Sequence, residues 1–399
     1  MTVQGLKNML VTLLVTSVAI GVKADCECGY STHVGSSKKT TVFTELLETD
    51  FSRTDDLTKN GEWILPSFNI TKEQTHGSFG LTFRPGNIMA LTNKGTSSAR
   101  SESGKNGKSN KPEKTPPVKD AALELRVSSQ LDEDMVSVAE IDTRGADLRY
   151  GSYRTSMQLT DVPGTCAAFM WYFNNTQEID MEFLSKDFNF KNGTYPVNLV
   201  VQSPKSNEED YDAAKAGNFI RTDLPFNPTK GFHEYRFDFV YGEVHFYADG
   251  QALAKIQGAI VPESSGHLVL QHWSNGNDVW SGGPPAKDTA ITVRYVKAYY
   301  NSTDHARQSA WNLRCTGAKS EANSICPIPD IGTNKSAENF FFSKKKNDTK
   351  LRNITDNKAA DTTPRPGGNE DEAGAIMWHV QMSITVGWAV MAGVAVFVL

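Results

Sequence analysis

A strict alternation of acidic and apolar residues over positions 178–184 (EIDMEFL) constrains the fold of this chain more than any other feature. Successive side chains of a β-strand point to opposite faces of the sheet. Glu178, Asp180 and Glu182 would therefore share one face, and the apolar residues between them would enter a core. The pattern predicts a half-buried strand of an all-β protein.

Three carboxylates in a row are unfavourable on an ordinary sheet, because like charges repel and raise one another's pKa. On a strand the Cα atoms of Glu178 and Glu182 lie about 13 Å apart, and side chains that lean together bring the carboxyl groups to roughly 5–6 Å. That separation is typical of a retaining glycosidase. One glutamate would attack the anomeric carbon and the other would serve as acid and then base, with Asp180 hydrogen-bonded to the nucleophile. The alternative is a solvated acidic edge strand, but the strand is amphipathic and follows the aromatic-rich segment 169–173.

Further segments rich in aromatic and β-branched residues follow the same strand pattern, with turn residues between them. No long amphipathic helix competes with them. The architecture that we predict is a single sandwich of two stacked sheets over residues 25–302, with one sheet concave enough to hold a chain ligand. The predicted strands are 123–127, 136–142, 150–159, 167–173, 178–184, 197–202, 234–240, 244–248, 267–273 and 291–299.

Both ends of the chain are apolar. Residues 1–24 are expected to be a removed secretion signal rather than a buried helix or a membrane anchor. Residues 376–399 have the character of a GPI-attachment signal, and the alternative is a short transmembrane tail. Seven N-x-S/T sequons agree with the secretory route and with a glycoprotein. The expected location is the extracellular face of the plasma membrane or the cell wall.

Three further regions differ in amino-acid composition from the predicted sandwich. Residues 94–119 form a Lys-rich, Ser-, Gly- and Pro-containing stretch that is expected to be a disordered insertion. Residues 303–330 form a small cysteine-containing cap, and residues 331–375 a glycosylated low-complexity stalk. The formal net charge of −5 and the lack of a basic domain argue against a nucleic-acid partner.

Five cysteines in an oxidising compartment predict two disulfides and one remaining thiol. Cys315 and Cys326 enclose a short loop and are expected to pair. Cys26 or Cys28 would then join the mature N-terminus to Cys166.

The segment 178–184 resembles the active-site strand of glycoside hydrolase family 16, and the likeness extends over residues 25–302. It includes 26–30 (CECGY), 150–154 (YGSYR), 164–169 (GTCAAF), 232–237 (FHEYRF) and 272–277 (HWSNGN), which are similar to segments of GPI-anchored fungal members. The resemblance implies a concanavalin A-like β-jelly-roll and retaining chemistry on β-1,3/β-1,4-linked glucan. It further implies Glu178 as nucleophile, Asp180 as its assistant and Glu182 as acid/base.

Aromatic rings stack on sugars, so Trp273, Trp280 and Tyr153 are candidate subsite walls, with Asn275 and Arg154 as hydrogen-bonding partners. For the two tryptophans, the alternative is ordinary packing under a loop.

No cofactor or catalytic metal is expected. His267 and His272 are separated by an odd number of residues and would face opposite sides of a strand.

Three functional classes remain: a hydrolase of β-glucan, a transglycosylase that remodels cell-wall polysaccharide with glucan or chitin as acceptor, and a catalytically silent lectin-like binding module. The intact set of three acids argues against the third class, because sugar binding alone does not require two closely placed glutamates.

Overall fold

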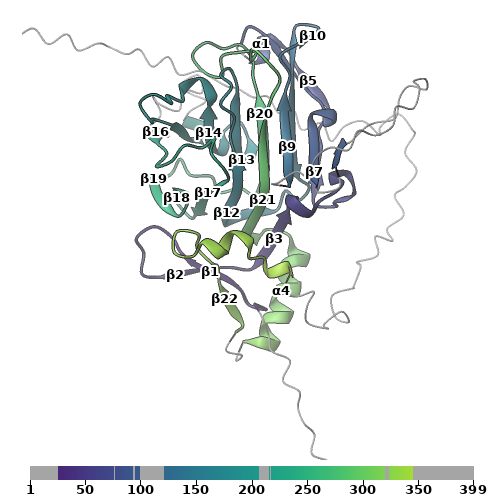
Figure 1. Ribbon diagram of the computed structural model, residues 1–399. Helices are drawn as coiled ribbons and strands as arrows, with labels where there is room; N and C mark the ends of the chain where they lie inside the picture. Colours follow the sequence, from purple (N-terminus) through teal and green to yellow (C-terminus); the bar gives the residue numbers. More distant parts are fainter. Residues whose placement is uncertain are drawn as a thin grey trace, which may run out of the picture.

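The structure is a computed structural model, and it describes residues 26–75, 77–92, 95–98, 121–205, 215, 217–319 and 323–344. Two large sheets pack face to face, and a smaller layer built from both ends of the described chain lies below them (Figure 1). The expected secretion signal, the expected GPI-attachment signal and residues 345–375 of the expected stalk lie outside the described residues. So does the expected insertion except for 95–98, which form a strand.

The first sheet contains ten strands and carries the acidic segment near its middle. Its order is β16 (Phe219–Asp223), β15 (Pro196–Gln202), β14 (Gln177–Leu184), β13 (Cys166–Asn174), β20 (His267–Trp273), β11 (Met135–Thr143), β6 (Gly80–Phe83) and β5 (Phe68–Ile70), with β4 (Trp63–Ile64) and β10 (Leu131–Asp132) also paired to β11.

The second sheet has nine strands, and β21 is its longest. Its order is β19 (Gln251–Gln257), β18 (Glu243–Ala248), β17 (His233–Val240), β12 (Leu148–Gln158), β21 (Thr289–Ser302), β9 (Ala122–Val127), β7 (Ile88–Thr92) and β8 (Gly95–Ser98), with β3 (Glu45–Asp50) also paired to β21.

The core lies between the two sheets and is largely aromatic at its centre. Phe169 packs against Phe237 with ring centroids 4.9 Å apart, and Phe183 packs against Tyr235 at 4.6 Å. Each pair joins the first sheet to the second, and all four rings are buried. Because every second residue of β13 and β14 enters this core, the acids of β14 must point away from it.

The two-layer all-β sandwich expected from the sequence is confirmed, and each of the ten predicted strands is present to within three residues at either end. The prediction omitted the short strands before residue 99, together with β10, β16, β19 and β22 (Ile325–Pro327). It also omitted helix α4 (His305–Ala318), which begins where the Asp304 side chain accepts a hydrogen bond from the Arg307 amide. The remaining helices are short: α1 (Lys72–Thr75), η1 (Phe51–Arg53), η2 (Leu57–Lys59), η3 (Pro85–Asn87), η4 (Ser185–Asp187) and η5 (Lys335–Asn339).

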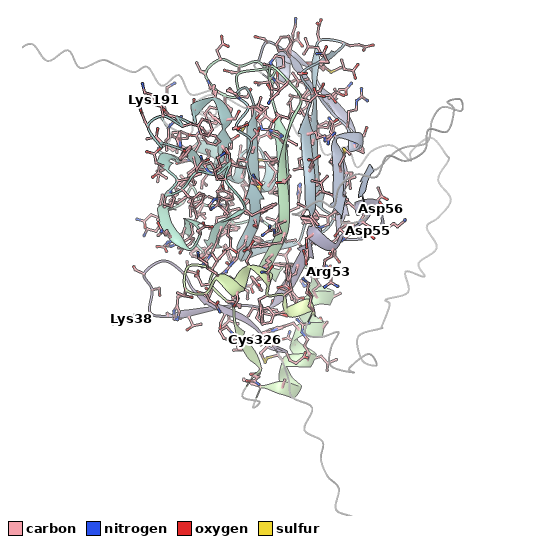
Figure 2. The ribbon with its side chains drawn as sticks, viewed as in Figure 1. Lys38, Arg53, Asp55, Asp56, Lys191 and Cys326 are labelled. Carbon is pink, nitrogen blue, oxygen red and sulfur yellow. A yellow bond between two sulfur atoms is a disulfide. The ribbon has the colours of Figure 1, made fainter. Side chains whose placement is uncertain are left out.

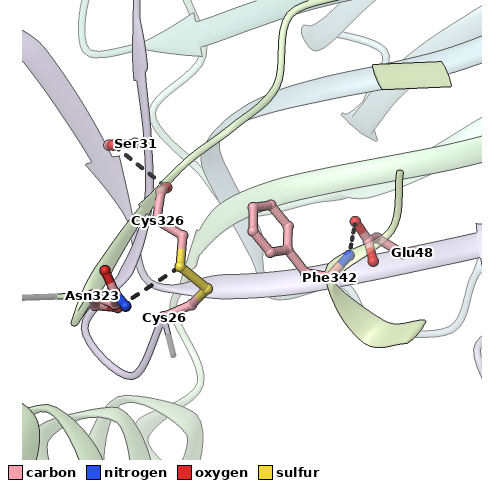
Figure 3. Close-up of a disulfide and its surroundings, with 6 residues drawn as sticks. All are labelled: Cys26, Ser31, Glu48, Asn323, Cys326 and Phe342. Atoms are coloured by element: carbon pink, nitrogen blue, oxygen red, sulfur yellow. Dashed lines mark hydrogen bonds between the residues drawn. A yellow bond between two sulfur atoms is a disulfide. The ribbon is translucent and has the colours of Figure 1, made fainter. Parts of the chain in front are cut away.

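The predicted disulfide pairing is wrong. Cys26 pairs with Cys326 and Cys28 with Cys315, while Cys166 remains a free, buried thiol. The reason is a third sheet in the order β2 (Thr40–Phe43), β1 (Gly29–His33) and β22 (Ile325–Pro327), in which the first and last strands of the described chain run parallel. Figure 3 shows the Cys26–Cys326 bridge in this layer.

The region after residue 330 is also more ordered than the expected stalk. Phe341 and Phe342 are buried, and the Phe342 amide donates a hydrogen bond to the Glu48 carboxylate of β3 (Figure 3). The Ser343 amide donates to the same carboxylate. Residues 331–344 therefore belong to the folded domain. Their aromatic side chains pack against the second sheet, which the largely polar composition of the segment did not indicate.

The described residues contain no helix that is both long enough and apolar enough to cross a membrane. Cys326 and helix α4 lie at the lower end of the molecule, whereas Lys191, in the loop that follows β14, lies toward the upper end (Figures 1 and 2).

The two disulfides are coupled through the loops that they close. With Cys28–Cys315 intact, Cys26–Cys326 closes a loop of about 15 residues, so Cys326→Ser should lower the free energy of unfolding by about 3 kcal/mol. Removing both bridges releases a loop of nearly 300 residues and should cost at least about twice as much. Denaturant unfolding of the single and double Cys→Ser variants measures this, and equal losses would contradict it.

Candidate active site

Strand β14 lies between β13 and β15, and the register fixes what its acids face. Glu182 lies opposite Ala168 of β13 and Asn198 of β15, and Asp180 lies opposite Met170 and Val200. Residues directly opposite in a sheet point to the same side. Because Phe169 and Phe183 point into the core, these rows lie on the outer face of the ten-stranded sheet. The structure thus brings Glu178, Asp180 and Glu182 together on one face, as the alternation predicts.

The three acids are desolvated to different degrees. Asp180 is 3% exposed, and Glu178 and Glu182 are half-buried. Burial raises the pKa of Glu178 to about 7, and a side-chain hydrogen bond with Asp180 opposes this rise. Burial and the charges of Glu178 and Glu182 raise the pKa of Asp180 well above its usual range. The raised pKa favours the protonated form of Asp180, which can donate its proton in a hydrogen bond to the Glu178 carboxylate.

Two hydrogen-bond donors from outside the acidic motif lie beside Glu182. The indole Nε1 of Trp280 donates to its Oε1 at 3.4 Å, and the Cys166 thiol lies 3.6 Å from the same oxygen. Burial, followed by the charge of Glu178, raises the pKa of Glu182 to about 7, while the two donors oppose the rise. Two neighbouring glutamates that both have pKa values of about 7 can hold one proton between them near neutral pH, and such a pair is suited to acid/base work.

The two tryptophans predicted to line the site, Trp273 and Trp280, occupy different positions. Trp280 is half-buried beside Glu182 and also contacts the ring of Phe219 from β16. Trp273 lies on the same face as the acids, opposite Cys166, but is only 1% exposed and packs in a buried apolar cluster. Asn275 is buried in the loop, where its Nδ2 donates to the Thr75 carbonyl and its Oδ1 accepts from Ser281. Of these three, Trp280 is the one with a hydrogen bond to a catalytic candidate.

The structure does not place Tyr153 and Arg154 at the acids. Both belong to β12 of the second sheet; Tyr153 is buried in the core, and its hydroxyl donates to the Arg149 carbonyl. Arg154 lies on the far face of that sheet, in a cross-strand row with Arg236 and Lys297. Its guanidinium donates to the Pro329 carbonyl. The sequence placed both residues on a strand correctly but could not tell which sheet that strand joins.

The two histidines of β20 face opposite sides, as their spacing predicts. His272 points into the sandwich and hydrogen-bonds the Leu125 carbonyl and Thr165 Oγ1, and burial lowers its pKa to about 4. His267 lies opposite Tyr172 in the row of Glu178. In the described ranges, no group of three or more His, Cys, Asp or Glu side chains is arranged to hold a metal ion.

The prediction missed a second set of acids on the same face. Glu140 and Asp142 of β11 lie two strands beyond β13, and Gln271 of β20 lies opposite Glu140. A signal was present in the sequence, because the tripeptide Glu-Ile-Asp occurs both at 140–142 and at 178–180. The first occurrence lacks the following Glu and so does not resemble an active-site motif.

Comparison with known proteins agrees with this geometry. Residues 115–297 match the family described as glycosyl hydrolases family 16. The chain carries a glycosyl hydrolase family 16 domain. That match includes β14 with its three acids, and it confirms the resemblance seen in the sequence at the level of the family domain; the GPI-anchored fungal subtype stays a prediction.

Relatives of the family 16 domain include a β-glucanase of Paenibacillus macerans, 32% identical over 139 residues, which are 33% of this chain and 52% of that protein. A β-glucanase of Bacillus licheniformis is 28% identical over 158 residues, which are 37% and 58% of the two chains. The chain thus spans about half the length of these relatives. A solved Bacillus licheniformis β-glucanase matches 63% of this chain and 97% of its own, with 15% identity and a TM-score of 0.45.

The raised pKa values predict a pH-dependent stability. A glutamate whose pKa is about 7 when folded and 4.5 when unfolded binds more protons in the folded state between those values, so stability falls as pH rises through that window. Glu178→Gln should therefore raise the free energy of unfolding by about 2 kcal/mol at about pH 8 and leave it nearly unchanged at about pH 4.

Thermal unfolding of both proteins across this pH range measures the difference. The control is Glu243→Gln, since hydrogen bonding to His245 lowers the pKa of Glu243 and its removal should not stabilise the protein at high pH. A Glu178→Gln gain that is equal at both pH values would contradict the prediction.

Proposed function

We propose that the family 16 domain is a retaining glycosidase that acts on β-1,3/β-1,4-linked glucan and remodels a fungal cell wall. The observation that carries the proposal is the row of Glu178, Asp180 and Glu182 on one face of β14, with both glutamates held near pKa 7. The relatives described above are β-glucanases, which supports the substrate class. The wall role rests on the secretion and GPI signals expected at the two ends of the sequence.

In the proposed mechanism, the ionised Glu178 carboxylate attacks the anomeric carbon while Glu182 gives its proton to the leaving glycosidic oxygen. The carbon–oxygen bond of the glycan breaks, and a glycosyl ester forms on Glu178. Glu182, now ionised, then takes a proton from water or from a sugar hydroxyl, whose oxygen displaces Glu178. Asp180 stabilises the Glu178 carboxylate by its hydrogen bond before attack and after release.

Hydrolysis and transfer use the same three acids and differ in the second step. Water as acceptor gives hydrolysis, and the hydroxyl of a glucan or chitin chain gives transglycosylation. Trp280 lies against Glu182, the group that activates the acceptor, and its half-buried ring is the surface on which an acceptor sugar would stack.

The proposed activity is tested by incubating the full-length protein with β-glucan and chitin oligosaccharides and weighing the products by mass spectrometry. Products longer than the input would establish transfer, and shorter products alone would establish hydrolysis. Glu178→Gln should reduce either rate by roughly a thousandfold or more. No product from the wild-type protein on any glycan would refute the glycosidase and favour the lectin-like module.

A second prediction concerns the donor on Glu182. Trp280→Phe removes the indole N–H that favours ionised Glu182, so the pKa of Glu182 rises. Since the general acid must hold its proton, the alkaline limb of the kcat/KM profile should move upward by about half to one pH unit.

The matched control is Trp311→Phe, because the Trp311 indole donates to the Cys28 carbonyl in the disulfide layer, away from the acids. That variant should leave the profile in place. If Trp280→Phe lowers kcat/KM without moving the alkaline limb of its pH profile, Trp280 does not control the pKa of Glu182.

A further inference from the structure

A second acidic group shares the outer face of the ten-stranded sheet with the proposed catalytic acids. Glu182 lies opposite Ala168, Ala168 opposite Gln271, and Gln271 opposite Glu140, in one row across four strands. Three strand spacings separate Glu182 from Glu140, which is about 14 Å. Asp142 follows two residues later on β11 and so points to the same side.

The acids of this second group have no positively charged partner among the residues that the structure describes. Glu140 is 2% exposed and accepts a hydrogen bond from Gln271 Nε2. Among the described residues, neither Glu140 nor Asp142 forms a salt bridge with a lysine or arginine. Burial raises the pKa of Glu140 to about 7, and burial together with the charge of Glu140 raises the pKa of Asp142. A buried acid pair of this kind retains a proton or takes a cation from a ligand.

The open atoms of the group are all hydrogen-bond acceptors. Within the described part of the chain, Asp142 Oδ1 and Gln271 Oε1 are buried and have no hydrogen-bond partner. Gln271 is 1% exposed, and its amide nitrogen already donates to Glu140. A group that only donates therefore fits best. An ammonium has three donors and no acceptor, whereas a hydroxyl or an N-acetyl group brings an acceptor of its own.

Apolar side chains separate the two acidic groups. Ala168, Met170, Tyr172 and Val269 form a buried cluster on the strands that separate β14 from β11. On the far side, Asp142 lies opposite Ile64 of β4, which is 38% exposed, so this end of the row reaches the surface. Apolar side chains flanked by polar groups suit the two faces and the rim of a sugar ring.

We propose that Glu140, Asp142 and Gln271 form a subsite that binds the protonated amine of a glucosamine residue in the glycan, about three strands from the bond that is cleaved. This rests on the proposed function and narrows its substrate class to wall glycans that contain un-acetylated glucosamine. The ammonium would donate to Asp142 Oδ1 and Gln271 Oε1, the buried acceptors that are open, and its charge would balance the acid pair.

The test uses three β-1,4-linked hexasaccharides that differ only at carbon 2 of each ring. They carry an amine (glucosamine hexaose), an N-acetyl group (chitin hexaose) or a hydroxyl (cellohexaose). Their affinities for the full-length Glu178→Gln protein, which should not turn them over, are measured by titration calorimetry near neutral pH. We expect glucosamine hexaose to bind at least about tenfold more tightly than either of the others.

Substitutions at Glu140 and Asp142 test whether the preference for glucosamine hexaose arises at the proposed subsite. Asp142→Asn and Glu140→Gln, made in the same background, keep the shape of the side chain and should each reduce the affinity for glucosamine hexaose by about tenfold. Binding of cellohexaose should change by no more than about twofold. The control is Glu243→Gln, which removes one negative charge from β18 in the second sheet and should leave the preference intact.

Equal affinity for the three hexasaccharides overturns the proposal without any variant. A preference that survives both Asp142→Asn and Glu140→Gln, or that Glu243→Gln reduces as strongly, overturns it as well. These failures are distinct from failure of the proposed function. If the wild-type protein processes glucans but shows no amine preference, only the subsite is wrong. If the amine preference stands while no glycan is processed, only the glycosidase is wrong.

Discussion

The packing of aromatic rings between the two sheets is the constraint on which the rest of the structure depends. Phe183 against Tyr235 and Phe169 against Phe237 join β14 and β13 to the second sheet. Fully burying a side chain of this size contributes about 1.5–3 kcal/mol. Because side chains alternate along a strand, this burial decides which residues face outward, and in β14 those residues are acids. The core thus holds together carboxylates that would otherwise repel one another.

The outer faces of the two sheets are completed in different ways. On the second sheet, Arg154, Arg236 and Lys297 form a cross-strand row that the chain itself covers. Pro329, Asp330 and Ala337 of the C-terminal segment accept hydrogen bonds from these three cations. Buried charges with such partners hold the C-terminal segment on the sheet. Arg154 has this role, although the sequence suggested it as a substrate-binding residue.

On the ten-stranded sheet the polar groups are left open. Among the described residues, Asp142, Asp180, Asn198, Gln202 and Gln271 each have a buried polar atom without a hydrogen-bond partner, and all five lie in adjacent cross-strand rows on the outer face. Each buried polar atom without a hydrogen bond lowers the free energy of unfolding, so a cluster of such atoms is uncommon where the side chains serve stability alone. The second sheet has such atoms as well, at Arg154 Nη2 and Glu234 Oε1, but on the ten-stranded sheet they lie in the rows of the acids of β14 and β11. This clustering supports the proposal that the ten-stranded sheet is the ligand-binding side, and the raised pKa values of its acids follow from the same burial.

The sequence by itself determined the β-sandwich, the strand that carries the acids and the face that they share, because side-chain alternation is a local property with a period of two. It also contained the Glu-Ile-Asp repeat of the second acidic group. Only the tertiary structure decided the disulfide pairing, the packing of residues 331–344, and the separation of Tyr153 and Arg154 from the site. Each of these depends on which strands become neighbours, and strand neighbours such as β1 and β22, about 300 residues apart, are chosen by the packing of the whole chain.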